Sequence, residues 1–427
     1  MIKVLLKGPI LSRSGYGEHT RYMFRALASR PDLFDLYIHP TGWGQSSWVL
    51  NPADNDESIA IKKCIEKIHQ FKDVFDLSLQ VLIPSEFENL ATKNIGVTAA
   101  VETTEASAQW INQCNFMDAV FVTSEHAKKS LVTPRHQVQL ENGDPYTIQI
   151  QKPVHVVSYP FRKFEKNEDV YEKMDLSTKF NFFTSAQFGP RKNLMNTIKW
   201  FVEEFKDEED VGLVVKAHHK NNSNLDRQRM LVQLAQSVHS VAHRKCRVFL
   251  LHGVLSDEEM NAVYNHPNIH AYMTATHGEG FGLPIFEAAC NGLPVVAPAW
   301  SGQVDFLYDD IVNKVSGRTK RTPMFTKVKH KLDKVPAEAV WENVIDENTQ
   351  WCYPDEVAFK KALRKVKDGY KAKKKIAEKL QTSLRDRLDQ DKMFAFVVDK
   401  ILEVCPEDFV ELEGFFDTLA DDLQVHE

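Results

Sequence analysis

Residues 276–297 read Thr276-His277-Gly278-Glu279-Gly280-Phe281-Gly282-Leu283-Pro284-Ile285-Phe286-Glu287-Ala288-Ala289-Cys290-Asn291-Gly292-Leu293-Pro294-Val295-Val296-Ala297. The chain is expected to leave a strand, cross a glycine loop, enter a helix near Leu283 and return to a second strand. Gly280 and Gly282 expose backbone N–H groups at the start of that helix, where Pro284 suits the first turn. The segment therefore predicts a site for an anion or for hydroxyl groups.

Two carboxylates in this segment are the strongest candidates for ligand contacts. Glu279 precedes the glycine loop, and Glu287 is expected one turn into the helix. There the Glu287 carboxylate can accept hydrogen bonds from two vicinal hydroxyls, as a ribose offers. Two unrelated surface acids are the alternative interpretation, which the surrounding glycine loop disfavours.

Short runs rich in Val, Ile, Phe and Tyr recur along the chain with helical patterns between them. This alternation is typical of parallel βαβ units. In the first half the predicted strands are Ile2–Leu6, Phe34–Ile38, Leu79–Ile83, Gly96–Val101, Ala119–Thr123 and Val154–Ser158. In the second half they are Phe180–Thr184, Gly212–Lys216, Arg247–Leu251, Ile269–Thr274 and Leu293–Ala297. We therefore predict an α/β fold with two separate, doubly wound, mainly parallel sheets.

The charged segment from Arg162 to Lys179 is the expected hinge between two large domains, which the length of 427 residues allows. The expected parts are a first domain at 1–165, a second at 166–390, and a C-terminal helix with an acidic tail at 391–427. Within them we predict a β-hairpin in Val132–Ile150 and periodic helices over Val357–Leu388 and Met393–Val404. These helices are expected to close the second domain and pack back toward the first.

A second glycine loop, Gly15-Tyr16-Gly17, follows the first predicted strand and precedes an amphipathic helix. Glycines at such a turn let backbone N–H groups approach a phosphate or a sugar. The loop is neither Gly-x-Gly-x-x-Gly nor a P-loop with Gly-Lys-Ser, which disfavours dinucleotide and ATP sites. A purely structural turn is the alternative.

Three cations follow predicted strands of the second half. Arg191 and Lys192 lie in the turn before a helix predicted from Leu194 toward Phe205, and Lys216 ends the next strand. An Arg fork and a Lys point charge can neutralise a diphosphate. Because cations at a helix N-terminus oppose its dipole, an anionic ligand explains them better than a charged helix start does.

Cysteine usage and the N-terminus point to a cytoplasmic protein. The six cysteines lie far apart, with no Cys-x-x-Cys pair and no Cys/His cluster, so we expect a reducing compartment and no metal site. The segment Met1–Pro9 has a lysine within its apolar run and predicts a first strand rather than a signal peptide. No run of eighteen apolar residues occurs, so no transmembrane segment is expected.

The net charge of −6 is unevenly distributed. Residues 401–427 hold nine acidic and no basic residues, which leaves the rest of the chain near +3. Basic residues gather in 314–334 and 360–387. A solvated loop and a solvated helix face are the main interpretation, and an anionic partner such as nucleic acid is the alternative.

The 279–287 motif resembles that of glycosyltransferase family 4, whose members share Glu-x7-Glu in the form Glu-Gly-Phe-Gly-Leu-Pro followed by a second Glu. The resemblance covers nearly the whole chain, through Gly15-Tyr16-Gly17, residues 118–125, Arg191-Lys192-Asn193, residues 252–256 and residues 351–355. It implies a GT-B fold of two facing Rossmann-like domains, with the donor mainly in the C-terminal one and the acceptor in the N-terminal one. It also implies retention of configuration and no obligatory metal or other cofactor.

The resemblance further implies roles for single residues. Glu279 faces the transferred sugar, Glu287 the ribose, Arg191 and Lys192 the diphosphate, and the backbone of Gly253 and Val254 the base. The remaining expected donor contacts are Gly15, Tyr16, Gly17, Lys216, Gly280, Phe281, Gly282 and Leu283.

The sequence departs from the family pattern at Glu102. Many members place a His near the sugar from the first domain, whereas this strand ends in Val101-Glu102-Thr103-Thr104-Glu105. Glu102 is the catalytic candidate at that position, and a structural Glu that caps the following helix is the alternative. The contact to the 6-position of the sugar stays open. The Asp-x-Asp triplets at 54–56 and 389–391 fall in a polar loop and after a helix, not at a strand end.

The predicted function is a metal-independent, front-face, retaining hexosyl- or pentosyltransferase that uses a nucleotide-sugar. UDP is the preferred nucleotide, with GDP and ADP open. The acceptor is a hydroxyl of a glycan, lipid or small molecule, and DNA with hydroxymethylated bases is the alternative that the basic segments suggest. A nucleotide-sugar-binding protein without turnover and an epimerase on the same fold are the competing classes.

Overall fold

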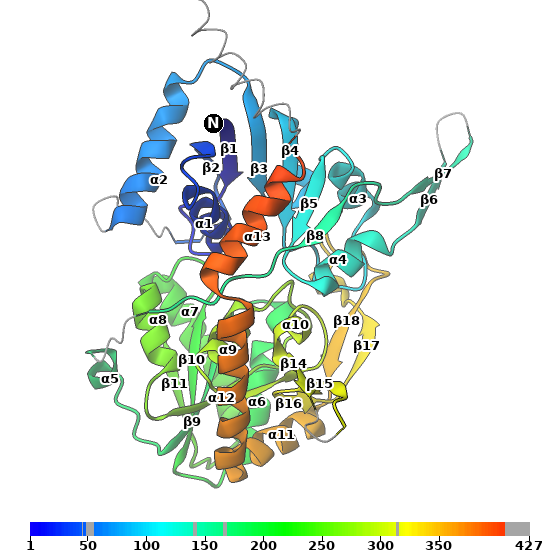
Figure 1. The fold of residues 1–427 in the computed structure, drawn as a ribbon. Helices are drawn as coiled ribbons and strands as arrows, with labels where there is room; N and C mark the ends of the chain where they lie inside the picture. The colour runs from blue at the N-terminus through cyan, green and yellow to red at the C-terminus, as the bar shows by residue number, and fades with distance from the viewer. Residues whose placement is uncertain (45, 48–54, 140–142, 165–168, 313–315, 406–427) are drawn as a thin grey trace, which may run out of the picture.

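The computed structural model describes residues 1–44, 46–47, 55–139, 143–164, 169–312 and 316–405. These residues form two lobes, each built on a six-stranded parallel sheet. Figure 1 shows the first lobe in blue and cyan above the second in green and yellow. The predicted α/β fold with two separate parallel sheets is confirmed.

The first sheet has the order β2-β1-β3-β4-β5-β8, and all its pairs are parallel. Every residue of β5 is buried, as expected for an inner strand with both faces covered. The strands are β1 Ile2–Gly8, β2 Phe34–Pro40, β3 Phe75–Val81, β4 Ala91–Thr98, β5 Ala119–Val122 and β8 Val154–Val156. The helices are α1 Gly15–Ala28, α2 Asp56–Lys67, α3 Ala108–Cys114 and α4 Glu125–Val132, with η1 Ile68–Gln70 and η2 Pro84–Glu86.

The second sheet has the order β11-β10-β9-β12-β13-β16, again with parallel pairs. Its strands are β9 Phe180–Gln187, β10 Val211–His218, β11 Arg247–Leu251, β12 Ile269–Met273, β13 Val295–Pro298 and β16 Thr326–Val328. Its helices are α6 Leu194–Phe205, α7 Asn224–His239, α8 Asp257–Tyr264, α9 Leu283–Cys290, α10 Val304–Leu307 and α11 Glu356–Asp368, with η3 Pro190–Lys192 before α6.

Strand order fixes where ligands can bind in each lobe. The chain builds outward from β9 to β11 on one side and then continues with β12 on the other side. The switch point therefore lies between β9 and β12, and in the first sheet it lies between β1 and β3. Crevices at the carboxyl ends of strands beside such points are the usual ligand sites of open α/β sheets. The loops after β1, β9 and β12 are the three that carry the predicted motifs.

Three antiparallel pairs and two short elements complete the molecule. The pair β6 His136–Gln139 and β7 Pro145–Ile148 confirms the hairpin predicted within Val132–Ile150. The other pairs are β14 Tyr308–Val312 with β15 Thr319–Pro323, and β17 His330–Lys334 with β18 Gln350–Pro354. The short elements are α5 Asp169–Lys173 and η4 Ala337–Ala339.

Two strand predictions in the first lobe are wrong in position. The strands predicted at Leu79–Ile83 and Gly96–Val101 are β3 and β4, which begin at Phe75 and Ala91. The residues that the predictions left out include the buried Ser78 and Asn94. Gln80 donates to Ser78 at 3.0 Å, and Ser78 donates to Asn94 at 2.8 Å. Because these polar groups satisfy one another inside the sheet, hydrophobicity alone did not reveal the first part of each strand. The short edge strand β16 was not predicted.

The C-terminal helices connect the lobes. The helix predicted over Val357–Leu388 is broken at Gly369 into α11 and α12 Tyr370–Arg387, and α13 Gln390–Leu402 follows. The helix α12 packs on α9 of the second lobe, whereas α13 packs on α1 of the first (Figure 1). The expected boundary at 165 and the acidic tail from 406 lie outside the described residues, so the domain limits stay predictions.

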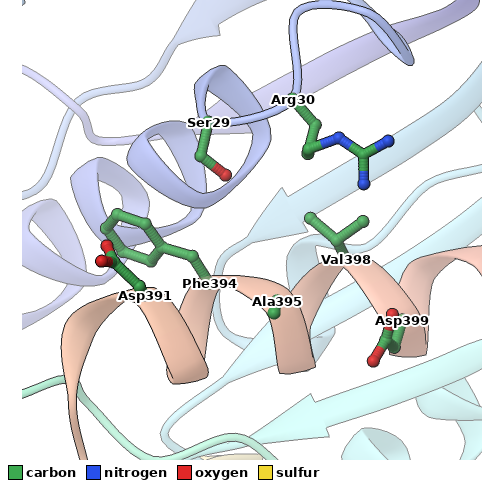
Figure 2. A pocket seen from close by; sticks show the side chains of 7 residues that line it. All are labelled: Ser29, Arg30, Asp391, Phe394, Ala395, Val398 and Asp399. Atoms are coloured by element: carbon green, nitrogen blue, oxygen red, sulfur yellow. The ribbon is translucent and has the colours of Figure 1, made fainter.

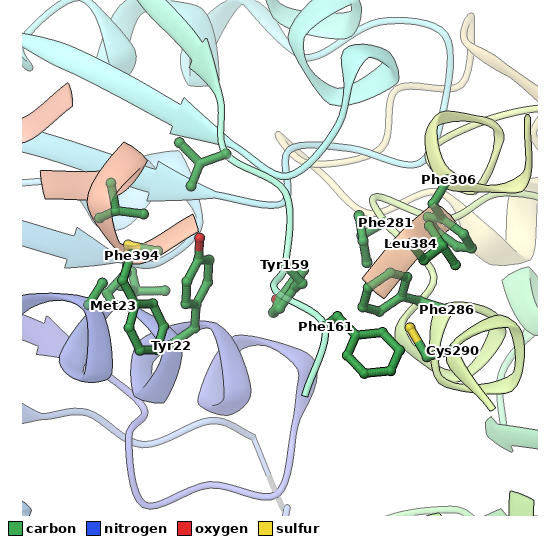
Figure 3. Close-up of a cluster of buried hydrophobic side chains, with 14 of the residues drawn as sticks. Tyr22, Met23, Tyr159, Phe161, Phe281, Phe286, Cys290, Phe306, Leu384 and Phe394 are labelled. Carbon is green, nitrogen blue, oxygen red and sulfur yellow. The ribbon is translucent and has the colours of Figure 1, made fainter. Parts of the chain in front are cut away.

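One hydrophobic cluster runs through both lobes. Figure 3 shows Tyr159 and Phe161, from the segment that crosses between the lobes, between Tyr22 and Phe394 on one side and Phe281 on the other. The Tyr159 ring lies 4.9 Å from the Phe281 ring, and the Tyr22 ring lies 6.0 Å from that of Phe394. The glycine loop that contains Phe281 is thus anchored in the shared core.

A shallow hollow of about 290 Å³ lies where α13 crosses the end of α1, as Figure 2 shows. It is lined by Ser29, Arg30, Asp391, Phe394, Ala395, Val398 and Asp399, none of them a predicted site residue. Within the described residues no helix is long and apolar enough to cross a membrane. The six cysteines are all free.

Candidate active site

The predicted motifs meet where the two lobes touch. Ser124 and Thr123, which follow β5 in the first lobe, donate to the carbonyl of Gly280 at 2.6 and 3.2 Å. A Cβ atom added at Gly280 would lie 2.7 Å from the carbonyl oxygen of Ala99, and one at Gly278 would lie 2.3 Å from that of Glu102. Glycine is needed at both positions because the backbones of the two lobes approach each other so closely.

Four ionised side chains form a cluster at this contact. Lys192 Nζ lies 2.7 and 2.6 Å from the two carboxylate oxygens of Glu279. Arg191 Nη1 donates to Glu279 Oε2 at 3.0 Å and to the carbonyl of Gly278 at 2.7 Å. Arg191 Nη2 lies 3.1 Å from Glu102 Oε1, so this ion pair joins the lobes. The structure therefore brings together the four predicted catalytic residues and rejects the helix-capping alternative for Glu102, because Ser107 is the N-cap of α3.

Burial and charge act in opposite directions on these groups. Burial alone would raise the pKa of Glu279, but the charges of Lys192 and Arg191 lower it, to about 2. Burial lowers the pKa of Lys192 despite the attraction of Glu279. The low pKa of Glu279 keeps its carboxylate ionised at neutral pH, opposite the two cations.

The turn that carries the two cations is held by the loop that follows β12. Asn193 adopts the left-handed conformation, with φ of 50°, and its side chain donates to the carbonyl of Ala275 at 2.9 Å. The N–H of His277 donates to the carbonyl of Arg191 at 2.8 Å. The turn after β9 and the loop after β12 are therefore fixed to each other at the switch point. The cations lie in η3, just before α6, rather than in its first turn.

Two residues that position Glu279 were missed by the sequence reasoning. Thr276 Oγ1 donates to Glu279 Oε1 at 2.9 Å, and Ser301 Oγ accepts from the Glu279 N–H at 2.9 Å. Thr276 belongs to the segment 276–297 and lies three residues before Glu279, so its contact with Glu279 could have been predicted from the sequence. Ser301 lies on a separate loop with φ of 68° and carried no local signal.

Glu287 belongs to a separate network. Its Oε2 accepts from the hydroxyl of Tyr264, in α8, at 2.8 Å, and no described hydrogen bond or ion pair joins it to Glu279. Burial raises the pKa of Glu287 to about 7, the Tyr264 hydrogen bond opposes this, and the negative charges of Asp257 and Glu18 add to it. Tyr264 is the hydrogen-bond partner of Glu287, and it was not predicted from the sequence.

The raised pKa makes a stability prediction for Glu287→Gln. The folded protein holds the proton of Glu287 more tightly than the unfolded chain does, because its pKa is about 7 when folded and 4.5 when unfolded. The carboxyl group therefore costs no stability below pH 4.5, and the free energy of unfolding falls as the pH rises from there through about 7. We expect Glu287→Gln and the wild type to be nearly equally stable at pH 4 and the variant to be about 1–3 kcal/mol more stable at pH 8. Urea unfolding at both pH values measures this, and an equal difference at the two would contradict it.

The first glycine loop is fixed by its own contacts. Ser14 caps α1 by accepting from the Gly17 N–H at 3.0 Å, and a Cβ atom at Gly17 would lie 2.0 Å from the carbonyl oxygen of Ser12. The Tyr16 hydroxyl lies 2.8 Å from Thr98 Oγ1, and the Tyr16 ring stacks on Trp43 at 4.2 Å. Gly15 has open space around it. The structural role is thus clear for Gly17, and Tyr16 is fixed by its hydroxyl and its ring.

Other predicted contacts lie at three different places. Lys216 Nζ donates to the carbonyl of Gly253 at 2.6 Å, apart from the Arg191 and Lys192 pair. Val254 is half exposed beside it. Phe281 is buried in the core, whereas Gly282, with φ of 97°, is the N-cap residue of α9 before Leu283.

No group of three or more His, Cys, Asp or Glu side chains in the described part of the chain is arranged to hold a metal ion. The two Asp-x-Asp triplets serve as helix starts where they are described. Asn55 caps α2, whose first residue is Asp56, and Asp389 caps α13. Asp54 lies outside the described residues.

Solved structures share this two-lobed arrangement. Sucrose-phosphate synthase from Thermosynechococcus elongatus is 12% identical, with a TM-score of 0.60, over 95% of this chain and 99% of that chain. The fold is GT-B. HepE of Anabaena in complex with UDP and glucose is 11% identical over 94% of this chain and all of that chain, with a TM-score of 0.59. Trehalose-6-phosphate synthase from E. coli bound with UDP-2-fluoro glucose is 9% identical over 94% of this chain and 98% of that chain, with a TM-score of 0.57. No protein-family model and no curated protein matches the sequence.

Proposed function

We propose that this GT-B protein is a retaining glycosyltransferase of family 4, which transfers a hexosyl or pentosyl group from a nucleotide-sugar to a hydroxyl acceptor. The observation that carries the proposal is the cluster of Arg191, Lys192 and the buried Glu279, at the switch point where the lobes meet. Two adjacent cations held where the lobes meet suit a diphosphate. The Glu279 carboxylate keeps these cations in place until the donor binds. The Glu-x7-Glu motif supports the same assignment.

Each residue then has a role toward the donor. Arg191 and Lys192 bind the diphosphate, Glu279 contacts the transferred sugar, and Glu287 accepts the ribose hydroxyls in place of the Tyr264 hydroxyl. The backbone at Gly253 and Val254 and the N–H groups before α9 bind the base and the phosphates. Glu102 orients Arg191 from the acceptor side.

The proposed reaction is a front-face transfer with retention. The bond from the sugar C1 to the β-phosphate oxygen breaks, the acceptor oxygen bonds to C1 on the same face, and the acceptor proton passes to the departing phosphate oxygen. The products are the glycoside and the nucleoside diphosphate. Negative charge grows on the leaving group, so Arg191 and Lys192 supply the main electrostatic stabilisation of the transition state, without an obligatory metal.

UDP is the preferred nucleotide, because two of the similar structures are described with UDP or a UDP-sugar. The acceptor is a hydroxyl compound in the cytoplasm. The alternative of DNA as acceptor loses part of its support. Lys360, Arg364 and Lys367 of the basic segment pair with Glu203, Glu204 and Glu208 inside the second lobe.

The test is incubation with a panel of UDP-, GDP- and ADP-sugars, with and without candidate acceptors, while released nucleotide is measured. Release that depends on Lys192 supports the transferase. Tight binding of a nucleotide-sugar with no turnover on any acceptor would favour a binding protein, and a changed sugar-nucleotide without acceptor would favour an epimerase.

The two glutamates are expected to give different kinetic effects. Glu279→Ala should lower kcat on the order of 100-fold, because it removes both the proposed contact to the reacting sugar and the ion pairs that hold Arg191 and Lys192, and it should change the Kd for UDP less. Glu287→Ala should weaken UDP binding on the order of tenfold with a smaller change in kcat. Steady-state kinetics and UDP titration measure both, and small, equal effects of the two substitutions would refute the roles.

A further inference from the structure

The antiparallel pair β17–β18 forms an arm, residues 330–354, at one side of the second lobe (Figure 1). In the described part of the chain its two strands pair only with each other and lie outside the six-stranded sheet. The connection between them reaches the first lobe, where Ser107 Oγ donates to the carbonyl of Asn343 at 2.8 Å. Val344 of the same connection is buried in a hydrophobic cluster of the first lobe. The arm therefore contacts both lobes.

The strand β18 is hydrogen-bonded to the loop of the first lobe that carries Glu102. The Thr104 N–H donates to the carbonyl of Gln350 at 2.9 Å, and the Gln350 N–H donates to Thr104 Oγ1 at 3.1 Å. Thr104 lies two residues after Glu102. Since these two hydrogen bonds fix Thr104 through both its backbone and its side chain, the position of the Glu102 loop depends on β18.

The next two residues of β18 are fixed to His277, in the loop that carries Glu279. The Cys352 N–H donates to the carbonyl of His277 at 2.9 Å, and His277 Nδ1 lies 2.5 Å from the carbonyl oxygen of Cys352. The Trp351 ring stacks on the His277 ring, with centroids 4.7 Å apart and planes 11° apart. His277 lies two residues before Glu279, so β18 holds the Glu279 loop as well.

Together with the ion pair between Arg191 and Glu102, these contacts form a closed circuit through both lobes. One half runs from the carbonyl of Arg191 through His277 to β18. The other half returns from β18 through Thr104 to Glu102 and its ion pair. In a closed circuit of packed and hydrogen-bonded groups, a shift of one member changes the distances between the others. A change in β18 therefore reaches the Glu102–Arg191 ion pair.

Trp351 is buried for a reason other than the packing of a lobe core. It is 1% exposed, yet it belongs to none of the hydrophobic clusters of the described residues. Its Nε1–H has no hydrogen-bond partner among those residues, which is unfavourable for a buried donor. The indole is held instead by the stack on His277 and by an edge contact with Tyr353, whose ring lies 6.3 Å away. The flat ring, and not its polar group, makes the contact at position 351.

We propose that Trp351 is a positioning residue, which holds the Glu279 loop and, through β18, the Glu102 loop in one arrangement. The inference rests on the proposed function, in which Glu279 contacts the transferred sugar and Glu102 orients Arg191. Trp351 acts on the reaction through His277. Misplacement of reacting groups by about 1 Å can cost about 100-fold in rate. Because the groups assigned to the base and the ribose lie outside the circuit, loss of the ring should lower turnover more than donor affinity.

The test measures kcat and KM of the full-length protein, with the nucleotide-sugar of the panel that the wild type turns over fastest, and the Kd for UDP. Trp351→Ala is expected to lower kcat about 30-fold or more, with KM and Kd within about threefold of the wild type. Trp351→Phe keeps a ring against His277 and removes the unpaired donor, so it should retain about a third or more of the kcat. The matched control is Trp341→Ala, which removes a 59% exposed tryptophan from the same arm and should match the wild type.

Hydrogen–deuterium exchange tests the link between the lobes without turnover. In Trp351→Ala the peptide that contains Thr104 should exchange about tenfold faster than in the wild type, although Thr104 belongs to the opposite lobe, because its N–H is bonded to Gln350. Trp341→Ala should leave this exchange unchanged. A substitution whose effect stays inside the arm would not change exchange in the first lobe.

A second pair of variants serves if Trp351→Ala does not fold. Thr104 is partly exposed, and Thr104→Val keeps its shape but removes the hydroxyl that accepts from the Gln350 N–H. Thr104→Val should lower kcat about threefold to tenfold, whereas Thr104→Ser keeps the hydroxyl and should retain most of the kcat.

Three results would overturn the proposal. They are a folded Trp351→Ala or, in its absence, a Thr104→Val with the kcat of the wild type, an equal loss of kcat and UDP affinity in Trp351→Ala, and unchanged exchange at Thr104 in Trp351→Ala. The second result would make Trp351 a support of the donor site as a whole. A wild type without turnover of any nucleotide-sugar would instead refute the proposed function, and exchange at Thr104 would still test the link between the lobes.

Discussion

Lys192→Ala is expected to lower the turnover of the nucleotide-sugar on the order of 1,000-fold. The Lys192 ammonium is held within 2.7 Å of both Glu279 oxygens, so it is already oriented at the place assigned to the leaving diphosphate. Removal of one preorganised group that neutralises a developing oxyanion typically costs about 10² to 10³ in kcat. Release of the nucleotide under saturating donor measures the effect.

The matched control is Lys199→Ala, in the following helix α6. Lys199 is exposed and lies 3.9 Å from Glu203, so the substitution removes the same charge from the same lobe outside the cluster. Its kcat should stay within twofold of the wild type. A Lys192→Ala enzyme with kcat within threefold of the wild type, correctly folded by circular dichroism, would remove the basis of the proposed mechanism.

Gly278→Ala is expected to lower kcat more than about 100-fold, although it adds only one methyl group. The added Cβ atom would lie 2.3 Å from the carbonyl oxygen of Glu102, in the backbone of the opposite lobe. The backbone must move, and this separates Glu102 from Arg191 and shifts the carbonyl that Arg191 holds. Misplacement of reacting groups by about 1 Å can cost about 100-fold in rate.

Gly189→Ala is the control for this substitution, because nothing lies within 4 Å of a Cβ atom at Gly189, one residue before the turn that carries the cations. It should leave kcat and the urea midpoint nearly unchanged. If Gly278→Ala keeps the kcat of the wild type, the close approach of Gly278 to the Glu102 backbone is not required for turnover.

Local sequence patterns were enough to predict which residues of the second lobe form the cluster. The strand, loop and helix around Glu279 and the turn at Arg191 and Lys192 each carry glycine, proline or charge at positions that local geometry demands. The parallel construction then places both at the carboxyl edge of one sheet. Glu102 was predicted only as the residue that stands where members of the resembling family place a His, and its ion pair with Arg191 was not predicted.

Partners from distant segments were not predictable. Ser301 and Tyr264 each act on a group in another part of the chain, and no periodicity or motif marks them. The same holds for the first residues of β3 and β4, where the buried Ser78 is satisfied by Asn94 of the neighbouring strand. Apolar patterns indicate burial, whereas hydrogen-bond satisfaction depends on what the fold brings alongside.

The sequence by itself determined the two parallel sheets, the loops that follow β1, β9 and β12, and the residue types available there, because strand and helix periods and glycine turns are local properties. Only the tertiary structure decided that Glu279 pairs with Arg191 and Lys192, that Glu102 pairs with Arg191 across the lobes, and that Glu287 lies in a separate network with Tyr264. Charge pairing and pKa depend on distances between groups remote in the chain, and the packing of the two lobes sets those distances.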